Sequence, residues 1–243
     1  MRHLVILTWA VSGLLWIGGP AASGDEPPVK KTDPFGGVLG KVREKAARTR
    51  CANSLKQLGI AFHTYADTNG TFPPAATYDK GGKALLSWRV AILPFIEEKK
   101  LYDEFKLDEA WDSDHNKKLL ARMPTLFADP AKIAKANQTF YQVFVGKGAA
   151  FEGQKGLKLT DFTDGTSNTI LVAEGGVDVP WTKPADLDYQ PGKKLPAVGG
   201  IFPKGFHALF ADGSVRFFPK TLKAKTLEAY ITRNGGEVIG NDD

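Results

Sequence analysis

A long amphipathic helix is encoded around residues 50–70, RCANSLKQLGIAFHTYADTNG. Apolar side chains recur there at spacings of 4, 3, 4 and 3 residues, which places them on one face of a helix. The members of this apolar stripe are Cys51, Leu55, Leu58, Phe62 and Tyr65. We expect the helix to begin near Val42, to span about 25 residues and to end at Asn69-Gly70, because Asn and Gly tolerate the left-handed conformation of a helix C-cap.

The first residues of the chain have the composition of an export signal. Arg2 and His3 precede an uncharged run from Leu4 to Gly19, and small residues follow up to Gly24. This order predicts a cleaved secretory signal peptide over residues 1–24, and an extracytoplasmic location that is periplasmic or secreted. The alternative is an uncleaved membrane anchor, but the run of 16 residues is shorter than the roughly 20 that a spanning helix needs.

The rest of the chain divides into a linker and a domain. Residues 25–40 are interrupted by proline and glycine without periodicity, and they predict a flexible tether. Residues 41–243 are expected to fold as a single domain, since the chain is 42% hydrophobic and 24% charged, as in ordinary globular proteins. The net charge of +5 comes without a basic motif interleaved with aromatic residues, so we expect no nucleic-acid partner.

Shorter elements follow the long helix. The clearest is a β-hairpin over Ala208–Phe218, for which Asp212-Gly213 predicts a two-residue type I′ turn with both residues at positive φ. Ser87 is expected to cap a helix that Pro94 divides. Further strands are predicted at Phe140–Val145 and Thr169–Ala173, and a last helix at Lys223–Arg233. The fold class is therefore α+β, with the long N-terminal helix packed on an antiparallel sheet.

Five blocks of residues, in this order along the chain, carry a resemblance to a known family. They are Arg50–Gly59, Asn69–Ala75, Ser87–Ile96, Thr163–Thr169 and Phe210–Val215. In these blocks the chain resembles a large planctomycete family of unknown function with a C-terminal Asp-Gly motif, from about Ala46 to the C-terminal helix. Members often begin with a prepilin-type cleavage and methylation segment. The resemblance implies a pilin- or pseudopilin-like head outside the cytoplasm, and it implies no biochemical role.

The chain departs from that family in two places. The usual prepilin start is missing and is replaced by the signal peptide and tether described above. Family members also commonly carry a histidine ten residues before the aspartate of the Asp-Gly motif. That position is Phe202 here, and the nearest histidine is His207.

The strongest candidate for a ligand site is the segment Asp161–Asn168. Asp161, Asp164 and Asn168 offer oxygen atoms of the kind that bind Ca²⁺. The alternative is a turn in which these side chains bond the local backbone and Gly165 takes a positive φ. We favour the turn, because such turns are common and the spacing is not that of an EF-hand.

No catalytic centre is predicted. Cys51 is the only cysteine, and His63 would lie roughly 18 Å further along the same helix, so the two cannot form a dyad. We expect Cys51 to be buried as a small apolar residue. The other candidates for a nucleophile or a metal ligand are expected to have structural roles. Ser167 lacks the flanking residues of a hydrolase nucleophile elbow. The histidines are spread too widely in the sequence to predict a metal cluster; they are His63, His115 and His207.

Acidic and aromatic residues give weaker indications of a functional site. The acidic side chains Glu97, Glu98, Asp108 and Asp112 are interpreted as solvated. Trp111 and Trp181 would stack on a sugar ring if exposed, whereas Trp88 is expected in the core. No catalytic, cofactor-binding or metal-binding residue is therefore assigned.

We expect a non-enzymatic structural or interaction module of the cell envelope. Its partners would be envelope proteins, and no stable membrane span would remain after signal cleavage. The alternatives are a secreted protein that binds calcium or a glycan and, third, an extracytoplasmic hydrolase.

Overall fold

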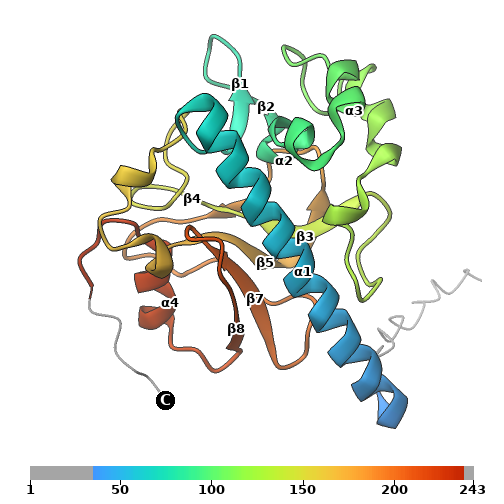
Figure 1. Cartoon of the computed structure of the whole chain (residues 1–243), viewed down its shortest axis with the longest axis vertical. Coiled ribbons are helices and arrows are strands. Elements are labelled where there is room, and N and C mark those ends of the chain that lie inside the picture. Colours follow the sequence, from blue (N-terminus) through green and yellow to red (C-terminus); the bar gives the residue numbers. More distant parts are fainter. Residues whose placement is uncertain (1–34, 238–243) are drawn as a thin grey trace, which may run out of the picture. The chain divides into compact units, whose positions relative to one another are not determined.

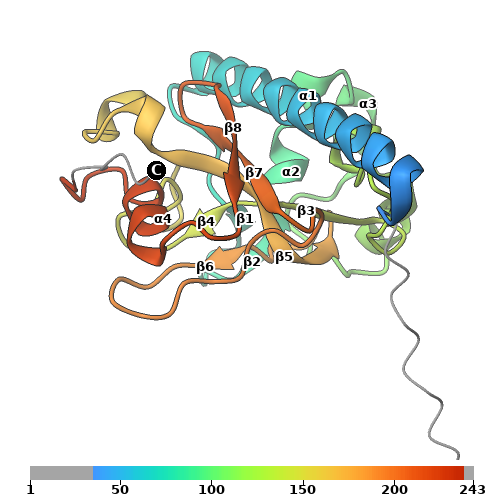
Figure 2. The ribbon, with the colours of Figure 1, turned by 90° about the horizontal axis from the view of Figure 1, so that it is seen from below.

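The computed structural model describes residues 35–237, in which a long helix crosses one face of an antiparallel sheet (Figures 1 and 2). The α-helices are α1 (Gly37–Asn69), α2 (Trp88–Ala91), α3 (Lys99–Glu104) and α4 (Ala224–Ile231). The 3-10 helices are η1 (Leu93–Ile96), η2 (Asn116–Arg122), η3 (Thr125–Phe127), η4 (Leu159–Asp161) and η5 (Thr166–Asn168). The strands are β1 (Ala76–Tyr78), β2 (Ala84–Ser87), β3 (Gln138–Gln142), β4 (Phe144–Val145), β5 (Ile170–Pro180), β6 (Leu187–Asp188), β7 (Gly205–Phe210) and β8 (Val215–Pro219). The predicted α+β class is confirmed.

Helix α1 is longer than its apolar stripe predicts. It begins at Gly37, so the expected tether over residues 25–40 is wrong for residues 37–40. The physical reason lies just before the helix, where Phe35 is buried and stacks on Phe202 with ring centroids 5.9 Å apart. The C-terminal end is as predicted, because Gly70 has φ +80° and its N–H donates to the Ala66 carbonyl.

The main sheet has the strand order β3-β5-β7-β8, and every neighbouring pair is antiparallel. Helix α1 packs against β7 and β8 on one face, and α4 lies against the opposite face (Figure 2). Of the five stripe residues, Cys51, Leu55, Leu58 and Phe62 are fully buried in the core, as predicted, and Tyr65 is partly buried. Two small sheets complete the fold, an antiparallel β1-β2 pair and a parallel β4-β6 pair.

The β7–β8 hairpin is confirmed, but its predicted turn type is wrong. Four residues, Ala211, Asp212, Gly213 and Ser214, connect the two strands, and Gly213 alone among them has a positive φ, of +83°. The Asp212 carboxylate accepts the Ser214 N–H at 2.8 Å, and the Gly213 N–H donates to the Phe210 carbonyl at 2.9 Å. This local bonding lets Asp212 keep an ordinary backbone conformation, so the left-handed residue is needed only once.

The smaller elements follow their predictions with shifted ends. The predicted helix is divided into α2, η1 and α3, with Pro94 in the first turn of η1, and the Ser87 hydroxyl accepts the Arg89 N–H as the predicted cap. The strand expected over Phe140–Val145 is divided at Val143, because the Val143 N–H donates to the Asp186 carboxylate instead of to a neighbouring strand. Strand β5 runs on past the expected end at Ala173 to Pro180, and α4 ends at Ile231, before the predicted glycine stop.

The described residues belong to one compact unit. The predicted signal peptide, residues 1–24, and the tether up to residue 34 lie outside the described residues. Within residues 35–237, no helix combines the length and the apolar composition that crossing a lipid bilayer requires.

Candidate functional site

Four polar side chains meet in the interior between α1 and the sheet, and we call them the buried cluster: Cys51, Tyr141, Glu174 and His207. Glu174 Oε1 lies at their centre, 2.6 Å from Cys51 Sγ and 2.8 Å from His207 Nδ1. The Tyr141 hydroxyl donates to Cys51 Sγ at 3.2 Å. A polar cluster of this kind inside an apolar core marks the first place to look for a function.

Strand register and the helix stripe bring these residues together. Tyr141 on β3 is paired directly with Glu174 on β5, and β7, which carries His207, is the next strand of the sheet. Alternate residues of a strand face the same side, so His207 shares with Leu209 the sheet face that α1 covers. Cys51 is the position of the α1 stripe that lies above Glu174.

Burial sets the chemistry of the cluster. Cys51 and Glu174 are inaccessible to solvent, and His207 is nearly so. Burial, together with the Glu174 carboxylate beside it, raises the pKa of the Cys51 thiol, and burial likewise raises the pKa of Tyr141. A nucleophilic cysteine needs a lowered pKa and an approach for its substrate. The protein groups around Cys51 therefore favour a neutral thiol that is not a nucleophile.

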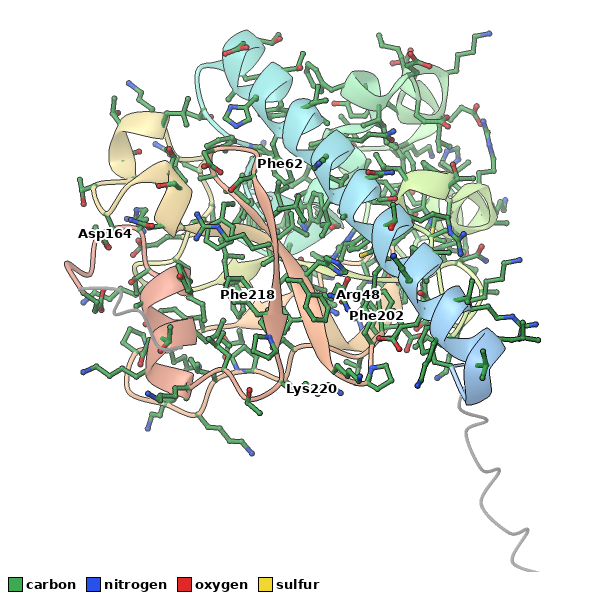
Figure 3. The ribbon with its side chains drawn as sticks, turned by 60° about the horizontal axis from the view of Figure 1, so that its bottom comes forward. Arg48, Phe62, Asp164, Phe202, Phe218 and Lys220 are labelled. Atoms are coloured by element: carbon green, nitrogen blue, oxygen red, sulfur yellow. The ribbon has the colours of Figure 1, made fainter. Side chains whose placement is uncertain are left out.

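An open groove of about 600 Å³ reaches the edge of the buried cluster at His207. We call it the basic groove, because four of its lining residues are cationic and one, Glu44, is acidic. The cationic residues are Lys41, Lys45, Arg48 and Lys204. Figure 3 labels Arg48 on α1, beside Phe202, and the Arg48 guanidinium lies 3.5 Å above the ring centre of Phe217.

The first two turns of α1 extend past the sheet (Figures 1 and 2). They carry exposed apolar side chains. We call these three residues the apolar end: Val38, Leu39 and Val42, with exposed fractions of 82%, 72% and 64%. Val38 and Lys45 are seven residues apart, which places them on the same side of the helix. The apolar end therefore adjoins the basic groove along α1.

The side chains of the segment Asp161–Asn168, which was weighed as a calcium site, bond the backbone. The Asp161 carboxylate accepts the Lys158 N–H, and the two oxygens of the Asp164 carboxylate accept the Gly235 and Gly236 N–H groups at 2.6 and 3.1 Å. The Asn168 amide donates to the Asp164 carbonyl. Gly165 has the positive φ, +98°, that the turn interpretation requires. The loop thus fastens the segment that follows α4, and these bonds support the turn reading.

The tryptophans considered for glycan stacking lie mostly in the interior. Trp181 is fully buried, stacks on Phe127 and donates its indole N–H to the Leu120 carbonyl, so no sugar ring can reach it. Trp88 is fully buried, as predicted. Trp111 is partly exposed, and the Lys183 ammonium lies 5.4 Å from its ring centre.

Sequence reasoning missed the buried cluster. Cys51 is buried as predicted, but it is hydrogen-bonded to Glu174 rather than surrounded by apolar groups alone. His207 lies beside it, whereas the His115 ring bonds the Glu104 carbonyl and His63 packs against Phe72. No spacing signal links Cys51 to Glu174, because 123 residues separate them.

A second set of buried polar groups centres on Arg89 and Asp186, which form an ion pair of 3.0 Å. Arg89 also donates to the Tyr141 carbonyl and the Ser87 hydroxyl. Asp186 Oδ1 accepts from Trp88, Arg89 and Val143. These hydrogen bonds already provide partners for the polar groups of Arg89 and Asp186. We therefore assign the ion pair a structural role in joining α2 to β3.

Comparison with known proteins gives one match. Residues 40–150 match the model of a family described as "Protein of unknown function (DUF1559)". The match supports a domain of unknown function. It covers less than half of the 243-residue chain and includes Cys51 and Tyr141 but not Glu174 or His207. No curated protein and no solved structure matches the chain.

Proposed function

We propose that this protein is a non-enzymatic interaction module of the cell envelope, which acts outside the cytoplasm. In this proposal it binds another envelope protein through the N-terminal end of α1. The observation that carries the proposal is the apolar end, where three large apolar side chains face solvent within two helical turns. A soluble domain gains nothing from such a cluster unless another surface covers it.

The positive charge of the basic groove indicates which kind of partner would bind. The basic groove beside the apolar end carries four cations and one carboxylate. A complementary surface would offer acidic side chains to the groove and apolar side chains to Val38, Leu39 and Val42. Nucleic acid would match the cations but would leave the apolar side chains in water. A membrane-surface helix lies flat along its whole length, whereas α1 packs against β7, β8, η1 and η3.

Among residues 35–237, the side chains considered for catalysis have structural partners, and this supports the non-enzymatic part of the proposal. The Cys51 thiol is sealed in the core with a raised pKa, and the Asp161 and Asp164 carboxylates bond the backbone. Location outside the cytoplasm rests on the signal-peptide pattern of residues 1–24.

Site-specific cross-linking tests the docking surface. A photoreactive amino acid would replace Leu39 in the full-length protein, expressed in the cells that normally make it. The matched control places the same group at Ile60, which is 68% exposed and lies twelve residues, or about 18 Å, beyond Arg48 of the basic groove on the same helix. We expect a discrete protein adduct from position 39, absent from position 60, and lost when Lys41→Glu and Lys45→Glu are combined.

Three outcomes would overturn the docking proposal. They are no adduct at position 39, the same adduct from position 60, and an adduct with lipid or nucleic acid. The envelope location is checked separately by fractionating the cells and sequencing the N-terminus of the product. We expect the product to begin after Ser23 or Gly24. Recovery in the membrane with Met1 retained would contradict signal cleavage.

A further inference from the structure

The buried cluster contains three side chains of the types that bind metal ions, each from a different element. Cys51 Sγ, a Glu174 carboxylate oxygen and a His207 ring nitrogen all lie within 4.8 Å of one another. Among residues 35–237 no other group of His, Cys, Asp and Glu side chains meets this geometric condition. We propose that Cys51, Glu174 and His207 bind a single zinc ion.

The donor atoms fit zinc. Zn²⁺ takes thiolate sulfur, imidazole nitrogen and carboxylate oxygen together, at distances of about 2.3, 2.0 and 2.1 Å. Ligands at those distances in a tetrahedron lie roughly 3.4–3.6 Å apart. Glu174 Oε1 is now 2.6 Å from Sγ and 2.8 Å from Nδ1. Ion binding would spread these atoms by up to about 1 Å, which small side-chain rotations supply.

One carboxylate oxygen of Glu174 has no hydrogen-bond partner among the described residues. This atom, Oε2, is buried, while Oε1 is shared by Cys51 and His207. An unpartnered carboxylate oxygen in a protein interior is costly. A cation between the three side chains would engage the carboxylate directly.

Charge balance favours a divalent ion. A thiolate and a carboxylate together carry two negative charges, which Zn²⁺ neutralises inside the core. Binding of the ion would release the thiol proton of Cys51, because a metal-bound thiol is deprotonated.

The site is placed to act as a structural clamp. Its ligands belong to α1, β5 and β7, so one ion would fasten the long helix to two neighbouring strands of the sheet. The His207 ring is oriented by edge contacts with Phe202 and Phe217, whose ring centres are 5.4 and 4.8 Å away. The Tyr141 hydroxyl lies 3.2 Å from the sulfur, so it would be close to the bound ion. This clamp is independent of the proposed docking at the apolar end.

Metal analysis of the purified protein tests the site. The protein is made with a tag that contains no histidine, purified without chelator, dialysed against metal-free buffer and measured by mass spectrometry. We expect a zinc-to-chain ratio near one. Replacing zinc with Co²⁺ should then give a thiolate-to-cobalt charge-transfer absorption. Cys51 is the only cysteine of the chain, so this band can have only one origin.

Variants assign the other ligands. Cys51→Ser should abolish the cobalt band, and His207→Gln should lower the zinc content at least tenfold. His115→Gln is the matched control, because His115 contacts the Glu104 carbonyl and lies outside the cluster. Chelation of the wild-type protein should lower its melting temperature, and zinc alone should restore it. Circular dichroism establishes that each variant is folded.

The proposal is overturned if wild-type protein, folded in the presence of zinc, retains none after dialysis. It is also overturned if Co²⁺ gives no thiolate band in wild-type protein, a result that does not depend on any variant folding. Retention of zinc at the wild-type level in a folded His207→Gln variant would assign the ion to other residues and reject this ligand set.

Discussion

Leu58 and Ile60 allow a direct comparison of a buried and an exposed position on the same helix. Leu58 is fully buried against the sheet, whereas Ile60 faces solvent. We expect Leu58→Ala to lower the free energy of unfolding by about 2–5 kcal/mol, the usual cost of emptying a buried leucine site. Ile60→Ala should cost less than about 0.5 kcal/mol. Urea unfolding of both variants checks this, and equal losses would contradict the assignment of the buried face.

Gly213 is the residue whose backbone conformation closes the β7–β8 hairpin. Its φ of +83° is accessible to asparagine but strongly resisted by a β-branched residue. A Cβ at this position would meet only the His63 ring, at 4.0 Å, so backbone strain rather than crowding dominates. We expect thermal unfolding to show a much larger loss for Gly213→Val than for Gly213→Asn. Similar melting temperatures would mean that the left-handed conformation is not required.

Asp164 separates the calcium and turn interpretations of its loop. Its carboxylate accepts the N–H groups of Gly235 and Gly236. We expect Asp164→Ala to lower the melting temperature by the same amount with and without calcium. About 1 mM Ca²⁺ should leave the wild-type melting temperature unchanged, although a site of micromolar affinity would gain about 4 kcal/mol from that thousandfold excess. A calcium-dependent rise that Asp164→Ala removes would establish an ion site.

At the scale of elements, α4 is attached through Tyr189, whose hydroxyl donates to the Glu228 carboxylate at 3.1 Å. Burial and the Glu228 charge raise the pKa of Tyr189 to about 12, from an ordinary value of 10.0. Between pH 10 and 12 the unfolded chain therefore ionises this tyrosine while the folded protein keeps it protonated. The contribution of Tyr189 to stability is complete below pH 10 and is lost as the pH rises through 12.

Tyr189→Phe removes this titration. We expect the unfolding free energy of the variant to fall less steeply with pH than that of the wild-type protein between pH 10 and 12. Urea titrations across that range measure the two slopes. Parallel slopes would show that Tyr189 does not keep its proton in the folded state.

Most features that depend on neighbouring residues could be predicted from the sequence, whereas features that depend on contacts between distant segments could not. The α1 stripe and the Gly70 stop depend on neighbouring residues, and both are visible in the sequence. The extra first turn of α1 depends on Phe35 stacking on Phe202, a contact between distant segments. The turn type was missed because the Asp212 side chain bonds Ser214 in place of a second left-handed residue.

The buried cluster lay beyond sequence reasoning for a related reason. Glu174 lies in a strand that otherwise has an apolar beginning, and nothing nearby in the sequence marks it as a partner of Cys51. Strand pairing places it opposite Tyr141, and helix packing adds Cys51 from 123 residues away. Sequence alone could identify Cys51 as buried, but not what it would face.

For the whole molecule, we expect the mature protein to stay soluble and not to assemble into pilus-like filaments. Filaments of the pilin type are held by bundles of apolar N-terminal helix segments. The stripe of α1 is already covered by the sheet, and its first half carries the charges of Lys41, Arg43, Lys45, Arg48 and Arg50. Sedimentation and electron microscopy of concentrated protein check this. Ordered filaments that disappear in Leu39→Glu would contradict it.

The order of α1 and β7–β8 along the chain has a consequence for biosynthesis. The helix leaves the ribosome early, but the strands that cover its stripe come near the end of translation. Until then the face of α1 that packs on β7 and β8 has no sheet to cover it in the nascent chain. Cys51 is open to oxidants throughout that interval. Cys51 becomes inaccessible to solvent once the β7–β8 hairpin has packed against α1.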